Sequence, residues 1–224
     1  MTSRSGRRRI YLDMERDRVR ARQLAKESLS QGDPTGWFDR LYREEEQGLS
    51  VVPWADRGPS PNLLRFEGAG KTALVVGCGF GDDAQEIASW GFKTTGFDIS
   101  PTAIRACEKR FSGVSFVAAD LLSPPAEWTG RFDFVLESNT LQALPVKIRP
   151  AATRSVAGFV KEGGMLLLIA RGREESEPEG NMPWPLTRRE VDLLKEFGLQ
   201  EKSFEDYFDD EEPPARRFRA VFVR

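Results

Sequence analysis

The spacing of apolar residues changes about a third of the way along the chain. Before that point they recur at roughly helical intervals, which predicts an amphipathic helix over about 10–30 and a shorter helix from about Thr35. The run QGDP at 31–34 separates the two helices, and the prolines of VVPWADRGPSPNLLRF predict extended, loop-like backbone after the second. We therefore expect residues 1–60 to form a helical segment that serves as a lid, packed on a core domain formed by residues 61–224.

In the following part of the chain, short apolar runs alternate with helical stretches. The expected strands cover 72–77, 93–98, 114–119, 132–137 and 164–170. The expected helices between them lie near 82–90, 101–111 and 148–161. Alternation of strands and helices at this spacing predicts a parallel sheet with helices on both faces.

The last forty residues predict a different arrangement. Thr187, with Glu190 three residues later, has the pattern of a capping box that opens a helix over about 187–197. Strands near 200–207 and 216–223 flank an acidic turn and predict an antiparallel hairpin at the sheet edge. The expected fold class is α/β: a Rossmann-like, doubly wound, seven-stranded and mostly parallel sheet with a C-terminal antiparallel hairpin.

Composition narrows the classes of function. The 224 residues are 39% hydrophobic and 30% charged, which predicts one globular α/β unit. A formal net charge of −2 argues against nucleic acid as a partner, and no apolar run approaches the ~20 residues that span a membrane. The basic N-terminus has no apolar segment behind it, so we expect no secretory signal. Two cysteines fit a cytoplasmic protein, which we expect to be a monomer or a weak homodimer.

The chain has no histidine, which removes histidine bases and histidine metal sites together, and no metal is expected.

The stretch ALVVGCGFGDD joins the first expected strand to the first expected helix. Its glycines at 77, 79 and 81 let the backbone turn tightly and approach a ligand without a Cβ in the way. The spacing is GxGxG, and Asp82 stands where the GxGxxG loops of dinucleotide-binding proteins have their third glycine. A carboxylate at this helix N-terminus disfavours a pyrophosphate. It is compatible with S-adenosylmethionine, which carries a sulfonium and an ammonium group and no phosphate.

Three more acidic side chains follow expected strands. Asp98 ends the second strand, where a carboxylate can accept hydrogen bonds from both hydroxyls of a ribose. Asp120 follows the third strand, where it can accept from an adenine amine while Leu121 packs on the ring. Glu137 stands at the tip of the fourth strand, at the crevice where the strand order of a doubly wound sheet reverses. Four signals in this order favour a methyltransferase over a nucleotide-dependent oxidoreductase.

At these positions the sequence resembles the class I S-adenosylmethionine-dependent methyltransferases, over about 71–170. In that family the glycine loop holds the methionine part of the cofactor, the acid after the second strand holds the ribose, and the acid after the third contacts adenine. Many members carry an acid where this chain has Val75. The resemblance implies a site for S-adenosylmethionine and its product S-adenosylhomocysteine at Gly77, Cys78, Gly79, Gly81, Asp98, Ile99, Asp120, Leu121 and Glu137.

The N-terminal segment resembles a narrower group. GWFDRLY followed by VVPWADRGPSPNLL is similar to the segment before the core in thiopurine, thiol and halide methyltransferases. The resemblance implies that Trp37 and Trp54 pack over the sulfonium and the substrate pocket, where electron-rich rings suit a cation. The other reading is that these tryptophans close the bottom of the core. The acid that usually follows the second tryptophan is Ala55 here, with Asp56 one place later.

We expect a small-molecule acceptor, with a thiol or another soft nucleophile implied by the resemblance. The residues expected on the acceptor side are Tyr42, Trp54, Asn139 and Trp184, under a lid formed by residues 30–60 and 180–186. A hydroxyl or amine acceptor would need a base, for which the candidates are Glu137, Asp56 and Tyr42. Glu137 comes first because of its place at the strand tip, although it could instead meet the cofactor through its backbone alone.

Other functions stay open at this point. One is an O- or N-methyltransferase of a specialised metabolite, and another is a non-catalytic, cofactor-binding protein whose charged N-terminal helix binds a partner. A nucleic-acid methyltransferase is disfavoured, because no Asn-Pro-Pro-Tyr-like tetrapeptide follows the fourth strand. The arginines at 216, 217 and 219 could contact an anion or form a solvated sheet edge.

Overall fold

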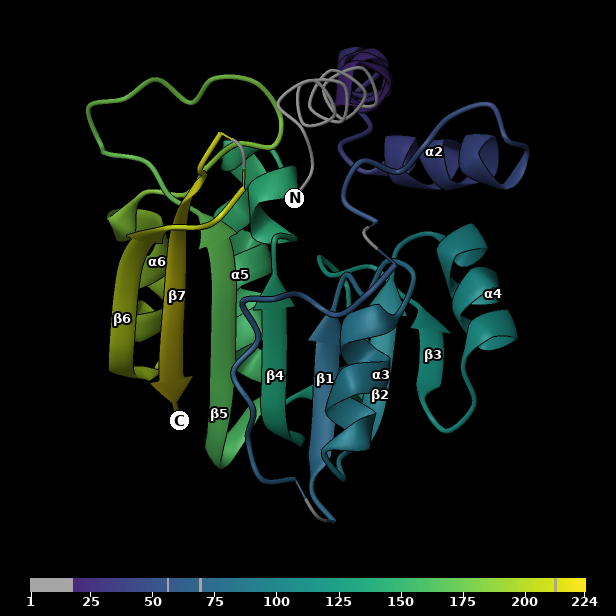
Figure 1. The fold of residues 1–224 in the computed structure, drawn as a ribbon. Coiled ribbons are helices and arrows are strands. Elements are labelled where there is room, and N and C mark those ends of the chain that lie inside the picture. Colours follow the sequence, from purple (N-terminus) through teal and green to yellow (C-terminus); the bar gives the residue numbers. More distant parts are fainter. Residues whose placement is uncertain (1–17, 56, 69, 212) are drawn as a thin grey trace.

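The computed structural model describes residues 18–55, 57–68, 70–211 and 213–224. In this part of the chain seven strands form one sheet in the order β3-β2-β1-β4-β5-β7-β6 (Figure 1). Neighbouring strands are parallel from β3 to β5, and β7 runs antiparallel to both β5 and β6. The strands are β1 Thr72–Val76, β2 Lys93–Asp98, β3 Ser115–Ala118, β4 Phe132–Ser138, β5 Val160–Arg171, β6 Gln200–Phe208 and β7 Arg216–Val223. The predicted fold class is confirmed.

Helices cover both faces of the sheet because its central strands are apolar on both sides. The helices of the core are α3 Asp82–Ser89, α4 Pro101–Arg110, α5 Arg149–Phe159 and α6 Arg188–Glu196, with short 3-10 turns η1 Ala126–Trp128, η2 Leu141–Ala143 and η3 Val146–Ile148. In β4, Phe134 and Leu136 pack on the face that carries α3 and α4. Val135 packs on the opposite face, which carries α5 and α6. This alternation places the carboxyl ends of β1, β2 and β4 together at one edge.

The capping box at the start of α6 is confirmed. The Thr187 hydroxyl accepts from the Glu190 amide, and the Glu190 carboxylate accepts from the Thr187 amide. Ser100 caps α4 as expected, because its Oγ accepts from the Ala103 amide at 3.1 Å.

The fifth strand is longer than predicted. It begins at Val160, directly after α5, whereas the sequence predicts helix to 161 and strand from 164. The polar run Lys161–Glu162 hides this start from a hydrophobicity pattern because both side chains point to solvent. Backbone pairing nevertheless holds the segment, since Val160 pairs with Phe132 and the Gly163 amide donates to the carbonyl of Arg224.

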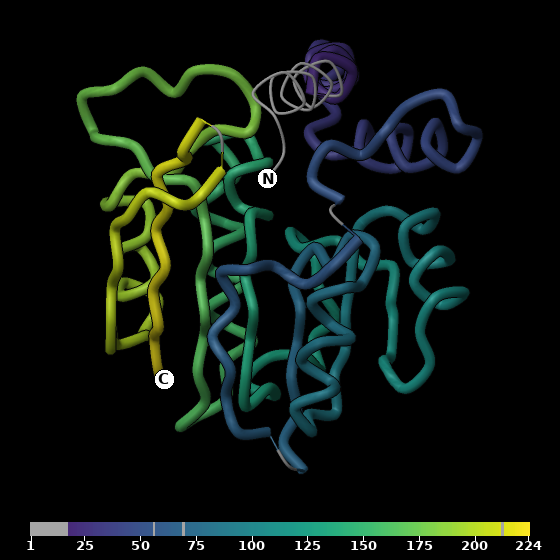
Figure 2. The backbone as a smooth tube through the Cα atoms, viewed as in Figure 1, coloured from purple at the N-terminus to yellow at the C-terminus, as the bar shows by residue number. Residues whose placement is uncertain are grey.

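The N-terminal segment lies across the carboxyl ends of the strands (Figure 2). It contains a helix over 18–30 and α2, Gly36–Glu46. Its apolar residues form a cluster with three residues of the core, listed here together: Ala21, Leu24, Ala25, Trp37, Leu41, Tyr42 and Val52 with Phe80, Ala103 and Met182. The segment is therefore packed on the core, while the predicted domain boundary at 60 stays a prediction. The predicted tail and helix start over 1–17 lie outside the described residues.

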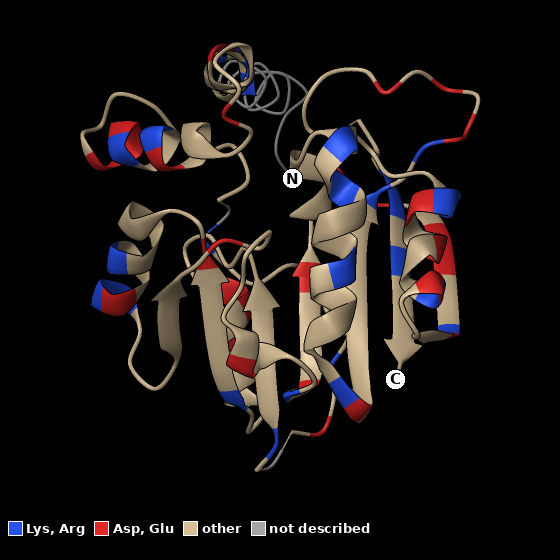
Figure 3. Cartoon of the chain, turned by 180° about the vertical axis from the view of Figure 1, so that it is seen from behind, with Lys and Arg blue, Asp and Glu red and all other residues tan. Residues whose placement is uncertain are grey.

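The helices α4 and α6 both carry basic as well as acidic side chains (Figure 3). Among the described helices, none combines the length and apolarity that a bilayer crossing requires. Oligomeric state and the expected absence of a nucleic-acid partner stay predictions.

Candidate functional site

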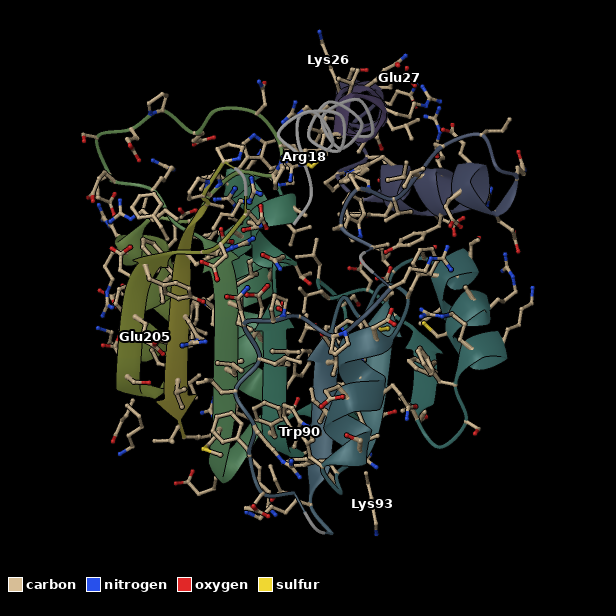
Figure 4. The ribbon with its side chains drawn as sticks, in the orientation of Figure 1. Arg18, Lys26, Glu27, Trp90, Lys93 and Glu205 are labelled. Atoms are coloured by element: carbon tan, nitrogen blue, oxygen red, sulfur yellow. The ribbon has the colours of Figure 1, made fainter. Side chains whose placement is uncertain are left out.

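A cavity of about 790 Å³ lies at the carboxyl ends of β1, β2, β4 and β5, beneath the N-terminal segment. Residues from the glycine loop, from the tips of the strands and from the turn between β6 and β7 line it. Arg18 lies over this end of the sheet, and Lys93 marks the opposite end (Figure 4). In open α/β sheets, ligands bind in a crevice at this position.

The glycine loop forms one wall of the cavity. Gly77 and Gly79 have φ values of +58° and +54°, which L side chains rarely adopt. A Cβ on Gly77 would lie 2.3 Å from Oγ1 of Thr140, and one on Gly79 would lie 3.2 Å from the hydroxyl of Tyr42. The loop therefore needs glycine both for its conformation and for the close approach of its neighbours.

Asp98 ties the loop to the second strand. Its carboxylate accepts from the Gly79 amide at 3.1 Å and from the Ser100 amide at 2.9 Å, and the residue is 7% exposed. Burial raises the pKa of Asp98 to about 6, although these two hydrogen bonds favour the ionised form. A carboxylate oxygen has two lone pairs, so each oxygen can also accept a ligand hydroxyl from the cavity.

Two carboxylates stand at the start of α3, on the rim of the loop. Asp82 forms two hydrogen bonds with Arg110, at 2.8 and 2.6 Å. Asp83 accepts from the Ser60 amide at 2.7 Å, and burial raises its pKa to about 6. Both residues line the cavity. Arg110 balances the charge of Asp82, so Asp83 supplies the negative charge at this helix N-terminus, which disfavours a pyrophosphate and suits a ligand that carries positive charge.

The turn after β3 forms the far end of the same wall. Asp120 accepts from the Leu122 amide at 2.8 Å through Oδ1, and Leu121 is 8% exposed. Both line the cavity beside Asp98. A carboxylate next to an apolar side chain can bind a flat ring that carries an amine.

Four aromatic rings form a second wall, which adjoins the glycine loop: Phe38, Tyr42, Trp54 and Phe80. The Trp54 indole N–H donates to the Tyr42 hydroxyl at 3.2 Å, and the Tyr42 and Phe80 rings meet edge to face with centroids 5.1 Å apart. Trp54 is 41% exposed and stands at the mouth. Burial, with Asp98 nearby, raises the pKa of Tyr42 well above its ordinary value, so the phenol keeps its proton at neutral pH.

Glu137 lies beneath the floor of the cavity, which corrects its expected position as a base facing the ligand. It is 0% exposed and is not among the residues that line the cavity. Its Oε1 accepts from the amides of Thr140 and Leu141, both at 2.8 Å, and so caps the turn η2. Burial raises the pKa of Glu137 to about 7, and Oε2 has no hydrogen-bond partner among the described residues. The carboxyl supports the floor.

The cavity brings together most of the residues that the sequence selected. Those on its wall are Gly77, Cys78, Gly79, Asp98, Ile99, Asp120, Leu121, Tyr42, Trp54 and Asn139. Gly81, Trp37 and Trp184 are not on the wall. Trp37 is 1% exposed and packs behind Trp54, while Trp184 is bound through its backbone to Gln142 and Arg149. Of the two large side chains expected from the segment 180–186, Met182 lines the cavity and Trp184 does not. Asp56 lies outside the described residues.

Sequence reasoning missed two residues of a polar wall at the carboxyl end of β5. Arg171 ends this strand and Gln142 comes from η2. Arg217, which the sequence offered as an anion contact or part of a solvated edge, lines the same wall from the start of β7. Arg217 donates to Asp209 at 2.6 Å and also to Glu211. The rule that selected Asp98, a polar side chain at the tip of a buried strand, would have found Arg171. No pattern in the sequence points to Gln142. No group of three or more acidic or cysteine side chains suited to a metal occurs among the described residues.

Comparisons with known proteins give a consistent result. Residues 73–164 match the methyltransferase domain family. A 2-heptyl-1-hydroxyquinolin-4(1H)-one methyltransferase of Mycobacteroides abscessus is 28% identical over 164 residues, which are 69% of this chain and 72% of that protein. A probable thiol methyltransferase 2 of Arabidopsis thaliana is 27% identical over 198 residues, 83% of each chain.

Among solved structures, an S-adenosylmethionine-dependent methyltransferase of Methanosarcina mazei has the same fold. The TM-score is 0.61 at 22% sequence identity, and the match covers 74% of this chain and 97% of that one.

Proposed function

We propose that the chain is a class I S-adenosylmethionine-dependent methyltransferase and that it methylates a small, partly apolar acceptor, which enters the cavity as an anion. The match to the methyltransferase domain family and the methyltransferase relatives support this proposal. Thiols are the first acceptor class to test. The observation that supports the proposal is the composition of the cavity wall. Residues that suit the cofactor lie next to aromatic rings, and neither a histidine nor the buried Glu137 is available on the wall as a base.

The described residues fit S-adenosylmethionine. The glycine loop brings Gly77 and Gly79, which carry no side chain, to the cavity wall. Asp98 offers a carboxylate to a ribose, and Asp120 with Leu121 offers an acid and an apolar surface to adenine. The acids at the start of α3 suit the positive charges of the cofactor and would repel a dinucleotide. The cofactor supplies an activated methyl group, because a sulfonium sulfur leaves as a neutral thioether.

The chain has to align the acceptor with the methyl group and exclude water. With the cofactor held by the glycine loop, Asp98 and Asp120, the acceptor would take the methyl group with its own lone pair, and the electron pair of the carbon–sulfur bond would remain on sulfur. An acceptor that arrives as an anion has no proton to lose, so the step needs no general base. This agrees with the buried position of Glu137 and with a phenol at Tyr42 that keeps its proton.

A series of thiol acceptors that differ in pKa tests the proposal. Purified enzyme with S-adenosylmethionine is given para-substituted thiophenols of different acidity, and formation of S-adenosylhomocysteine is followed against pH. We expect the apparent pKa of kcat/KM to follow the pKa of each thiol, because the thiolate is the form that reacts. One apparent pKa near 7 shared by all acceptors would indicate an enzyme base and contradict the proposal.

The N-hydroxy heterocycle named for the Mycobacteroides relative supports a second candidate, an acidic hydroxyl attached to nitrogen or to an aromatic ring. Such a hydroxyl also ionises near neutral pH, so it would use the same wall without a base. Turnover of 1-hydroxyquinolin-4(1H)-one without turnover of any thiophenol would assign the acceptor atom to oxygen.

Replacement of Glu137 by glutamine tests whether this residue stabilises the turn η2 or acts as a base in the reaction. Glutamine keeps the oxygen that caps η2, so we expect kcat to stay within about threefold of wild type. A loss of a hundredfold or more would return Glu137 to the reaction as a base.

The same variant has an expected signature in stability. The folded-state pKa of Glu137 is about 7 and its ordinary value is 4.5, so the folded protein binds this proton more tightly than the unfolded chain does. The free energy of unfolding of the wild type therefore falls as pH rises from about 4.5 to 7, by on the order of 3 kcal/mol from this group. Glu137→Gln lacks that titration. In urea unfolding we expect its stability relative to wild type to increase across this range.

A further inference from the structure

Gln142 is held at both ends on the acceptor side of the cavity. Its side-chain Oε1 accepts from the backbone amide of Arg171 at 2.6 Å, and its own carbonyl accepts from the backbone amide of Trp184 at 2.7 Å. The residue is 4% exposed and lines the cavity. Two backbone hydrogen bonds from two different segments therefore fix where this side chain lies.

These bonds also fix which way the amide faces. The Arg171 backbone N–H is a donor, so the Gln142 atom that meets it must be the oxygen, and the NH₂ group must be on the other branch. Within the described part of the chain, Nε2 has no hydrogen-bond partner, and this atom is not fully buried. The NH₂ group is therefore accessible, and its residue lies on the cavity wall.

Arg171, whose backbone amide meets Gln142, also lines the cavity and carries a guanidinium. Its guanidinium donates to Glu211 at 3.0 Å, and its side chain is 23% exposed. Glu211 is shared, because Arg217 also donates to it. Burial lowers the pKa of Arg171. The positive charges of Arg18 and Arg217 lower it as well, because they disfavour another cation nearby. Glu211 and Asp209 act in the opposite direction. What this corner offers a ligand is therefore the N–H donors of Arg171 that Glu211 does not take up.

We propose that Gln142 Nε2 and the Arg171 guanidinium together recognise an oxygen of the acceptor, either a carbonyl or an oxyanion placed beside the atom that is methylated. The inference rests on the proposed function. An oxygen on the substrate can accept hydrogen bonds from both groups. An amine or hydroxyl on the substrate that needs to donate would find no partner there, and its unpaired donor would lower the affinity. Gln142 thereby determines acceptor specificity, because its orientation is set before a ligand binds.

Two aromatic thiols that differ at one ortho position provide the probe: 2-mercaptobenzoate, with a carboxylate, and 2-methylthiophenol, with a methyl group. Each is titrated calorimetrically into the complex of the wild-type protein with S-adenosylhomocysteine. We expect 2-mercaptobenzoate to bind at least tenfold more tightly. Equal affinities, or no binding of either thiol, would overturn the inference.

Gln142→Glu supplies the matched test, because it keeps the oxygen that accepts from Arg171 and replaces the NH₂ donor by an acceptor. We expect it to weaken 2-mercaptobenzoate at least tenfold and to change the affinities for 2-methylthiophenol and S-adenosylhomocysteine by less than twofold. Gln200→Glu makes the same chemical change on an exposed residue at the other end of the sheet and should leave all three affinities unchanged.

A uniform loss of all three affinities in Gln142→Glu would mean that Gln142 only supports the fold and would overturn its role in recognition.

Failure of this inference can be distinguished from failure of the proposed function. If S-adenosylhomocysteine itself fails to bind the wild-type protein, the proposed function fails. If it binds and the two thiols do not differ, only the recognition of oxygen fails.

Discussion

Asp98→Ala is expected to weaken binding of S-adenosylmethionine by at least a hundredfold. A carboxylate that accepts from both ribose hydroxyls contributes about 3 kcal/mol, and 1.4 kcal/mol corresponds to a tenfold change. The variant also removes the bonds that hold the Gly79 and Ser100 amides, so the loop loses its tie to β2. Calorimetric titration with S-adenosylhomocysteine measures the loss. An affinity within threefold of wild type would remove Asp98 from the cofactor site.

Asp133→Ala is the matched control. Asp133 also accepts from a backbone amide, that of Thr72 at 2.9 Å, but it lies at the amino end of the sheet. We expect this variant to lower stability while cofactor affinity is retained.

The wild type should show a related pH dependence. The pKa of Asp98 is about 6, so its carboxyl becomes protonated below that pH and loses lone pairs that accept. The dissociation constant for S-adenosylhomocysteine is therefore expected to rise by roughly tenfold as pH falls from 7 to 5. Asp98→Ala should lack that dependence.

Gly77→Ala is expected to abolish measurable cofactor binding and to lower the free energy of unfolding by about 2–4 kcal/mol. Alanine at φ +58° costs about 1 kcal/mol, and overpacking against a fixed neighbour costs about 1–3 kcal/mol more. The neighbour is fixed because Thr140 Oγ1, 2.3 Å from the added Cβ, donates to the Val76 carbonyl at 3.0 Å. Moving Thr140 disturbs the turn that forms the cavity floor.

Gly130→Ala separates the two costs. Gly130 has φ +60°, and a Cβ there would meet nothing within 4 Å. We expect this control to lose about 1 kcal/mol and to bind the cofactor normally. In the double variant Gly77→Ala, Thr140→Ala, the atoms at 2.3 and 2.8 Å are gone, so part of the stability should return. If Gly77→Ala bound as the wild type does, the close packing of the loop would not matter for the site.

The sequence predicted the fold well where burial on both faces produced apolar runs bounded by turns. Strands β1, β2 and β4 lie within one residue of their expected ends, and Ser100 and Thr187 mark helix starts through cap hydrogen bonds that depend on local sequence alone. The start of β5 was missed because Val160 and Gly163 pair through their backbones, while the polar residues between them are exposed. Hydrophobicity records side-chain burial and not backbone pairing.

The residues on the cofactor side of the cavity could be predicted from the ends of the strands, because parallel strands bring their carboxyl ends together. The residues on the acceptor side could not be predicted in this way. Gln142 reaches the wall because η2 turns its side chain toward the Arg171 amide, and Glu137 misses the wall because the same turn draws its carboxylate inward. Both orientations depend on a short 3-10 turn whose direction is set by tertiary contacts. Trp184 was misplaced for a similar reason, since its backbone is bound to Gln142 and Arg149.

Calorimetric titration of the wild-type protein with S-adenosylmethionine, S-adenosylhomocysteine and NADH is the most direct test of the central claim, that the glycine loop and Asp98 hold a sulfonium cofactor. We expect both sulfur compounds to bind at one site with micromolar dissociation constants and NADH to give no heat of binding. No binding of either sulfur compound, or NADH binding as tightly as they do, would contradict the claim.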